Sequence, residues 1–347
     1  MKLSLFLASM LLALLALEQV GANDANDSNE TDKMPPGLKL KKEKIPKNRR
    51  LKNMKKENPA EMKKMMREKG LIDISEEDGL VPLITAKDGS NVPNQYIARL
   101  LPGGKYGKSW YASRFTNSRD YDGHGTHVAS TLGGATYGVA KEVNIIPVKV
   151  CADKRSCYYS DMVEGLYWIK SRVQRYKRLS VINISISGPY VSYVNDAVYA
   201  ALYAGIPVVV SAGNDDMDNA CYKTPASVQG ALTVGATQMN DYVASFSNIG
   251  PCVDIYAPGT KITAADYANN YGGIESDGTS MASPLVAGAV AGLLQVFCDA
   301  GYYSVPSTSL VDDINYNIIE FAEKGTVRGL PSTNNNNVML QTMCLNT

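Results

Sequence analysis

Apolar and polar positions alternate in blocks from about residue 144 onward. Short runs rich in Val and Ile predict buried strands, and amphipathic stretches between them predict helices. The predicted strands span 144–150, 181–186, 207–211, 231–236 and 252–256, and the predicted helices span 161–176, 194–204, 280–294 and, more weakly, 309–322. Strands that alternate with helices predict an α/β fold with a mostly parallel sheet. Residues 328–347, with four consecutive asparagines, predict a ragged tail.

The first 22 residues have the pattern of a secretory signal peptide. One early lysine precedes an apolar core, and Val20-Gly21-Ala22 supplies the small residues of a cleavage site. The core is too short for a membrane span, and no later segment stays apolar long enough to cross a bilayer. We therefore expect a secreted, extracellular product without a membrane partner.

Residues 23–75 form a basic leader. Residues 33–69 hold fifteen Lys or Arg and four Asp or Glu, a balance of +11, so the remaining residues carry −10 of the chain's net +1. This composition predicts a solvated, disordered segment with a short helix at 59–69. Two alternatives remain open: a tail that binds polyanions, and a processing region cut at Arg49-Arg50.

Ser280 follows Gly278-Thr279 and precedes a small-residue apolar run. The pattern places Ser280 at the N-terminus of a buried helix, where unpaired N–H groups favour a developing negative charge. A serine there suits nucleophilic attack on a carbonyl. An N-capping serine on a core helix is the alternative.

Two other stretches favour a catalytic role for Ser280 over a role as a helix cap. The segment from Asp122 to Ser130 contains both histidines of the chain, His124 and His127, between glycines, which is an unusual pattern for residues that only pack. A metal site would need further ligands that the neighbourhood does not supply. Asn214 ends the buried run at 208–214, at the carboxyl edge where α/β sheets build their sites. A base, an amide donor and a nucleophile together indicate acyl transfer.

These three stretches resemble the His, Asn and Ser boxes of the subtilisin-like serine proteases (subtilases), in particular the proteinase K and aqualysin branch. Other matching stretches include Tyr137-Gly138-Val139-Ala140, Thr233-Val234-Gly235-Ala236 and Ala257-Pro258-Gly259. The resemblance implies a subtilisin-like three-layer fold and a serine endopeptidase that cuts extended polypeptides. It assigns His124 as general base, Ser280 as nucleophile and Asn214 as oxyanion donor. A monomer without a nucleic-acid partner is expected.

The resemblance also implies domain boundaries and a missing part. Residues 76–105 resemble the remnant of an inhibitory prosegment, 106–325 an incomplete catalytic domain, and 326–347 a tail. No apolar run ending in the family's Asp-Ser/Thr-Gly precedes His124, so the N-terminal strands and the acid of the triad are expected to be missing. Asp120 and Asp122 are too close in sequence to reach back to His124. Asp88 has a suitable separation but follows a turn-like pattern.

Two segments should line the substrate cleft by the same resemblance. Ser156 falls in the edge strand that pairs with substrate, and Ser185, Ser187 and Gly188 fall at the primary pocket. Arg155, Cys157 and Ser187 add bulk where relatives keep glycine, so the subsite preference does not carry over. An ordinary loop and strand end are the alternative for both segments.

Six cysteines with a secretory leader indicate disulfides rather than zinc. The resemblance implies a Cys221–Cys252 bridge; proximity and elimination suggest Cys151–Cys157 and Cys298–Cys344. It also implies a structural calcium site at Asp254 with the carbonyls of Gln229 and Ala231, whereas a simple surface acid is the alternative. The chemistry itself requires no cofactor.

The leading interpretation is thus a secreted subtilase that is inactive and unstable because strands and the triad acid are missing. Three alternatives remain open. The chain could be an active protease that uses Asp88, a non-catalytic peptide-binding or decoy remnant, or the product of a truncated or mis-spliced transcript.

Overall fold

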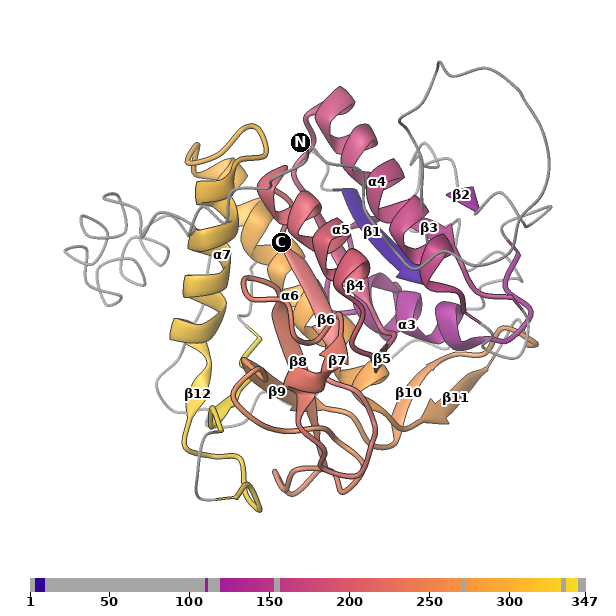
Figure 1. Cartoon of the computed structure of the whole chain (residues 1–347), viewed down its shortest axis with the longest axis vertical. Coiled ribbons are helices and arrows are strands. Elements are labelled where there is room, and N and C mark those ends of the chain that lie inside the picture. Colours follow the sequence, from indigo (N-terminus) through magenta and orange to yellow (C-terminus); the bar gives the residue numbers. More distant parts are fainter. Residues whose placement is uncertain are drawn as a thin grey trace, which may run out of the picture.

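The computed structural model describes residues 4–9, 110–111, 119–152, 157–269, 272–331 and 335–342. They form one nine-stranded sheet with helices on both faces (Figure 1). The strand order is β12 (Glu323–Lys324), β13 (Val338–Met339), β9 (Ile255–Pro258), β8 (Leu232–Thr237), β6 (Val208–Ser211), β4 (Ser180–Ile184), β1 (Ser4–Ser9), β3 (Asn144–Lys149) and β2 (Trp110–Tyr111). All neighbouring pairs are parallel except β12 and β13.

The helices make the two outer layers. α3 (His124–Gly133) and α6 (Thr279–Asp299) pack on one face, and α7 (Thr308–Phe321) lies against α6. α4 (Tyr159–Tyr176) and α5 (Ser192–Tyr203) cover the other face (Figure 1). The expected three-layer α/β architecture is therefore confirmed, with a buried apolar core on each side of the sheet.

Smaller elements complete the fold. The hairpin of β10 (Ile262–Ala265) and β11 (Gly273–Ser276) packs against α3, and β5 (Gly188–Pro189) pairs with β7 (Lys223–Thr224). A 3₁₀ turn spans Ala220–Tyr222. The hairpin was not predicted from sequence because β11 is mostly exposed and carries no apolar alternation.

The expectation that the sheet lacks interior strands is wrong for the described residues. Ser4–Ser9 forms β1, in parallel register with β3 on one side and β4 on the other, ending with Ser9 opposite Lys149. This segment lies within the predicted signal peptide. An extended backbone in this position satisfies the hydrogen-bonding groups along two strands that would otherwise face a gap.

The prediction of a ragged C-terminal tail is also wrong. β13 joins the sheet between β9 and β12, and the asparagines before it are used as hydrogen-bonding groups. Asn335 accepts from the Gly250 N–H, and Asn337 bonds both the N–H and the carbonyl of Val327. The polar run therefore anchors the tail to neighbouring loops.

α6 corrects one further expectation, that no later segment is apolar enough to span a membrane. By length and composition this helix could do so, but most of it is buried inside the protein, against the sheet, α3 and α7. It is the core helix of the domain. The predicted helix at 59–69 and the prosegment-like residues 76–105 lie outside the described residues.

Candidate active site

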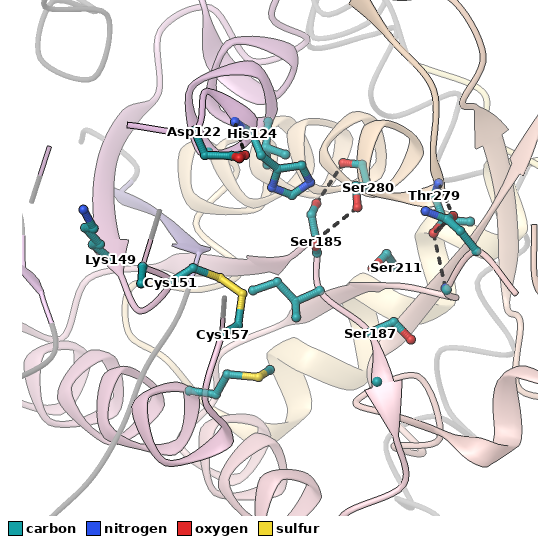
Figure 2. Close-up of a pocket in the computed structure, with 18 of the residues that line it drawn as sticks. Asp122, His124, Lys149, Cys151, Cys157, Ser185, Ser187, Ser211, Thr279 and Ser280 are labelled. Atoms are coloured by element: carbon teal, nitrogen blue, oxygen red, sulfur yellow. Dashed lines mark hydrogen bonds between the residues drawn. A yellow bond between two sulfur atoms is a disulfide. The ribbon is translucent and has the colours of Figure 1, made fainter. Parts of the chain in front are cut away.

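A cavity of about 590 Å³ opens at the carboxyl ends of β3, β4 and β6. Its walls come from residues 120–129 at the start of α3, 185–189 after β4, 211–215 after β6, and 279–280 at the start of α6. The Cys151–Cys157 disulfide, Tyr159 and Met162 line another side. The fold thus gathers the three stretches singled out from sequence around one space (Figure 2).

Ser280 is the second residue of α6 and is half-buried in the cavity wall. The preceding Gly278 has φ 149°, a conformation that favours glycine and lets the chain enter the helix sharply. The Ser280 hydroxyl donates to the Ser185 carbonyl at 3.2 Å, and the Ser185 hydroxyl donates to the Ser280 carbonyl at 2.8 Å (Figure 2). This reciprocal pair joins the end of β4 to the N-terminus of α6.

His124 is the first residue of α3, and its ring points toward Ser185 and Ser280 in Figure 2. The side chain is half-buried and lines the cavity. Its backbone N–H donates to Asp122 Oδ1 at 3.3 Å. The sequence-predicted base and nucleophile therefore face the same space from different elements.

Asp120 supports α3 rather than the imidazole. Its carboxylate accepts the N–H groups of Asp122, Gly123 and Thr126 at 2.8–3.0 Å and the Thr126 hydroxyl at 2.7 Å. Burial opposes ionisation, but these donors hold the pKa of Asp120 below its usual range. An ionised carboxylate at a helix N-terminus is also favoured by the helix dipole.

Both histidines were expected to take part in chemistry. For His127 this expectation is wrong, because its side chain is a buried structural group. This residue is 3% exposed, and its Nε2 lies 3.0 Å from the Ile262 carbonyl and 3.1 Å from the Ile274 carbonyl. Because carbonyls only accept, Nε2 carries the proton and ties α3 to β10 and β11. Burial lowers the pKa of His127 and so favours the neutral ring.

Asn214 follows β6 and is oriented by Thr279, a residue that sequence reasoning missed. The Asn214 Oδ1 accepts from the Thr279 N–H at 2.9 Å and from the Thr279 hydroxyl at 2.7 Å. Since the carbonyl end is held by α6, the amide nitrogen remains available as a donor beside Ser280. The only sequence signal for Thr279 is its position directly before the serine.

Ser187 and Gly188 line the cavity as predicted, whereas Ser156 and Asp88 lie outside the described residues. The Ser187 hydroxyl is buried without a partner among the described residues. A Cβ placed on Gly213 would lie 2.8 Å from this hydroxyl, so Ser187 touches the opposite wall. A Cβ on Gly188 would clash with the Tyr159 hydroxyl, which accounts for glycine at that position.

The described residues contain two disulfides, of which only Cys151–Cys157 lines the cavity. Cys221 is joined to Cys252, as the resemblance implies, and Cys151 to Cys157 at the cavity edge. Cys344 lies outside the described residues, so the Cys298–Cys344 bridge stays a prediction.

Asp254, the candidate calcium ligand, is half-buried beside β8. Its Oδ2 accepts from the Thr233 N–H at 2.8 Å. Burial nevertheless raises the pKa of Asp254 to about 7, because this one hydrogen bond does not offset the lost hydration. An undercompensated carboxylate suits a cation, although no group of three acidic, His or Cys side chains occurs in the part of the chain that the structure describes.

Comparisons with known proteins show what the chain is similar to. A family model described as "Subtilase family" matches residues 103–320. The chain is 45% identical over 208 residues to an extracellular serine proteinase of Thermus sp. (strain Rt41A), covering 60% of this chain and 50% of that protein. It is 37% identical over 243 residues to the subtilisin-like serine protease pepC of Aspergillus niger, covering 66% and 45%.

Among solved structures, the chain is similar to a cold-adapted subtilisin-like serine proteinase. The TM-score is 0.58 at 30% identity, covering 73% of this chain and 99% of that one. The chain spans about half the length of the curated relatives it matches.

Proposed function

The chain belongs to the subtilase family, and from this premise we propose that the cavity is a peptide-cleaving site built on Ser280, His124 and Asn214. One observation carries the proposal. A serine at the N-terminus of a buried helix, a histidine ring and an amide side chain, from three separate elements, face one cavity. The substrates proposed are extended polypeptides, because the relatives are named as proteinases and the cavity follows the ends of neighbouring strands.

Each residue then has a defined role. Ser280 Oγ attacks the scissile carbonyl, while His124 accepts the hydroxyl proton and returns it to the leaving amine. The Asn214 amide and the Ser280 N–H stabilise the negative oxygen of the intermediate. Before attack, the Ser280 hydroxyl must exchange its bond to the Ser185 carbonyl for one to the imidazole.

We propose that turnover is low. In serine proteases an acid fixes the tautomer of the histidine, and its removal costs roughly 10⁴-fold in turnover. The sequence before His124 contains no apolar run ending in the family's acidic motif, and the nearby Asp120 carboxylate is used by the backbone of α3. Asp88 is the alternative acid.

A second candidate function is peptide binding without cleavage. The observation that favours it is the Ser280 hydroxyl, whose single proton is donated to a carbonyl rather than to His124. A hydroxyl held in this way is not activated, whereas the cavity stays lined for a peptide. This candidate predicts binding to unfolded polypeptides that survives Ser280→Ala.

Secretion, a monomeric state and bound calcium are proposals too. Two disulfides and the similarity to a proteinase named as extracellular support an oxidising location.

For calcium, Asp254 would supply the carboxylate and Gln229 and Ala231 the carbonyls. Adding Ca²⁺ at pH 7.5 should raise the melting temperature of the wild type but not of Asp254→Asn; an equal rise in both would refute the site.

Hydrolysis tests the proposed function directly. We expect the purified full chain to release little or no peptide from fluorescent casein, and Ser280→Ala to abolish any release. Asn214→Ala should lower residual activity by about 10²–10³-fold, as loss of one oxyanion donor does elsewhere. Cleavage that persists in Ser280→Ala would exclude this site.

A further inference from the structure

The C-terminal part of α4 and the two residues after it carry an unusual concentration of positive charge. Lys170, Arg172, Arg175, Lys177 and Arg178 lie within nine residues, and no acidic residue occurs between Glu164 and Asp196. We call these five residues the α4 cationic surface. With +5 here and +11 at 33–69, all other residues together carry −15 of the net +1. The charge is therefore segregated rather than mixed.

Aromatic rings hold three of these cations in place. Arg172 Cζ lies 5.4 Å from the Trp168 ring centre and 5.1 Å from that of Tyr176. Arg175 Cζ lies 5.6 Å from the Tyr176 ring centre. Lys170 Nζ lies 5.5 Å from the Tyr167 ring centre. Such stacking orders long side chains before any ligand binds, which lowers the entropy cost of binding.

Among the described residues, the same cations have no acidic partners. The ion pairs within the described residues join Lys223 to Asp215 and Asp218, and Lys324 to Glu320. The helix dipole explains cations at the end of the helix, such as Arg175 in the last turn and Lys177 at the C-cap, but its effect fades within one turn. It therefore does not account for Lys170 and Arg172 in the body of the helix.

The α4 cationic surface is separate from the active-site cavity. The first turn of α4 reaches the cavity through Tyr159 and Met162, whereas no residue beyond Met162 on this helix lines it. At 1.5 Å per residue, Lys177 is roughly 27 Å along the helix from Tyr159. Figure 1 shows α4 on the outer face of the domain, beside α5. A large ligand could therefore bind here without blocking the cleft.

The chemistry of the surface and the disulfides indicate the class of ligand. Guanidinium and ammonium groups bind sulfate and carboxylate groups, and the exposed rings of Tyr167 and Tyr176, 40% and 50% exposed, can stack on sugar rings. Disulfides persist in oxidising compartments, where nucleic acid is not the prevailing polyanion. Within the part of the chain that the structure describes, the exposed apolar residues are mostly tyrosines and include no aliphatic cluster that would insert into a membrane.

We propose that the α4 cationic surface binds a linear sulfated polysaccharide and thereby localises the protein. The surface acts independently of the peptide site, so the proposal does not depend on whether Ser280 is reactive.

The test is binding of a fluorescent heparin oligosaccharide to the full chain, measured by anisotropy between 50 and 400 mM NaCl. Arg172→Gln/Arg175→Gln removes two charges from the surface. Lys261→Gln/Lys324→Gln removes two charges elsewhere and is the matched control. Both variants keep residues 33–69, so the basic leader contributes equally. Melting curves establish that each variant folds, and Lys170→Gln/Lys177→Gln is a second variant of the same surface.

At about 150 mM NaCl we expect the α4 variants to bind at least tenfold more weakly and the control to change less than twofold. The slope of log K against log salt should fall by roughly 1.4–1.8 for two lost contacts, by analogy with nucleic-acid polyanions. Equal losses in variant and control would overturn the proposal. An equal or larger effect on single-stranded DNA, or on vesicles of anionic lipid, would also overturn it in favour of that ligand.

Discussion

Ser187 shows how one side chain can set the selectivity of the cleft. Its hydroxyl spans the space between the end of β4 and Gly213, where a Cβ would lie 2.8 Å from it. The hydroxyl is buried without a partner among the described residues, so it fills space without gaining a hydrogen bond there. The serine therefore occupies space next to Gly213 in the lining of the cavity.

We predict that Ser187→Gly shifts the preference of the site toward larger substrate side chains. Peptidyl phosphonates that differ only in the residue next to the reactive group, Ala against Phe, measure this at Ser280. The ratio of labelling rates, Phe over Ala, should rise about tenfold, because removing a clash of this kind is worth roughly 1–3 kcal/mol. An unchanged ratio would show that Ser187 does not limit the pocket.

At the same scale, the resemblance to subtilases identified His124 and Ser280, whereas the residue pattern alone did not separate His124 from His127. Both histidines share one glycine-flanked segment, and only the packing of α3 determines which one is buried. Two other contacts were likewise not predictable from the sequence. The Asp120 cap depends on a local turn of the backbone before α3, and the Asn214–Thr279 contact joins residues that are far apart in the sequence.

At the scale of elements, two sets of polar contacts hold the first turns of α3 in position. Asp120 binds its N-terminal N–H groups, and His127 connects it to the β10–β11 hairpin. His124 is the first residue of this helix, so the orientation of the proposed base depends on both contacts.

We predict that His127→Ala destabilises the fold by about 2–4 kcal/mol, through a lost hydrogen bond and a buried cavity. His124 is half-buried, so His124→Ala should destabilise the fold far less and serves as the control.

Because the pKa of His127 is lowered below its ordinary 6.5, only the unfolded state gains a proton as pH first falls below that value. Wild-type stability should therefore fall below about pH 6.5, and His127→Ala should lose this component. Chemical denaturation at pH 5, 6 and 7.5 measures both effects.

The Cys221–Cys252 disulfide closes a loop with a sequence separation of 31 residues. On the chain-entropy relation, Cys221→Ser/Cys252→Ser should lower the free energy of unfolding by about 3–4 kcal/mol. Mass mapping of non-reduced peptides should recover the linked pair in the wild type. Two free thiols there, or an unchanged melting temperature in the variant, would contradict the assignment.

The sequence predicted the strands that are buried on both faces of the sheet, and it missed strands that are exposed or lie near the edge. β3, β4, β6 and β8 are apolar runs in the interior of the sheet, and each was predicted within two residues. β13 follows a run of asparagines and β11 is exposed, so neither has an apolar signature. β1 has one, but an apolar run after an early lysine is equally typical of a signal peptide.

For the whole molecule, β1 decides whether the sheet is continuous. It pairs along its length with β3 and β4, so its removal exposes backbone groups on two interior strands. Each buried unpaired group costs about 1–3 kcal/mol, against a total stability of about 5–15 kcal/mol. Cleavage of a signal peptide after residue 22 would remove this strand.

We therefore predict that a chain lacking residues 1–22 aggregates or melts without cooperativity, whereas the full chain melts cooperatively. Scanning calorimetry of both forms, with N-terminal mass analysis of any secreted product, measures this. A secreted, cleaved protein that melts as cooperatively as the full chain would show that another segment fills the position between β3 and β4.

The most direct test of the central claim is labelling of the full chain with a fluorophosphonate probe, located by peptide mass analysis. We expect slow labelling at Ser280 alone, abolished by Ser280→Ala, strongly reduced by His124→Ala and unchanged by Asp88→Asn. No labelling of a cooperatively folded chain would contradict a reactive serine site. Fast labelling that Asp88→Asn removes would contradict the missing acid and make Asp88 the third member of the triad.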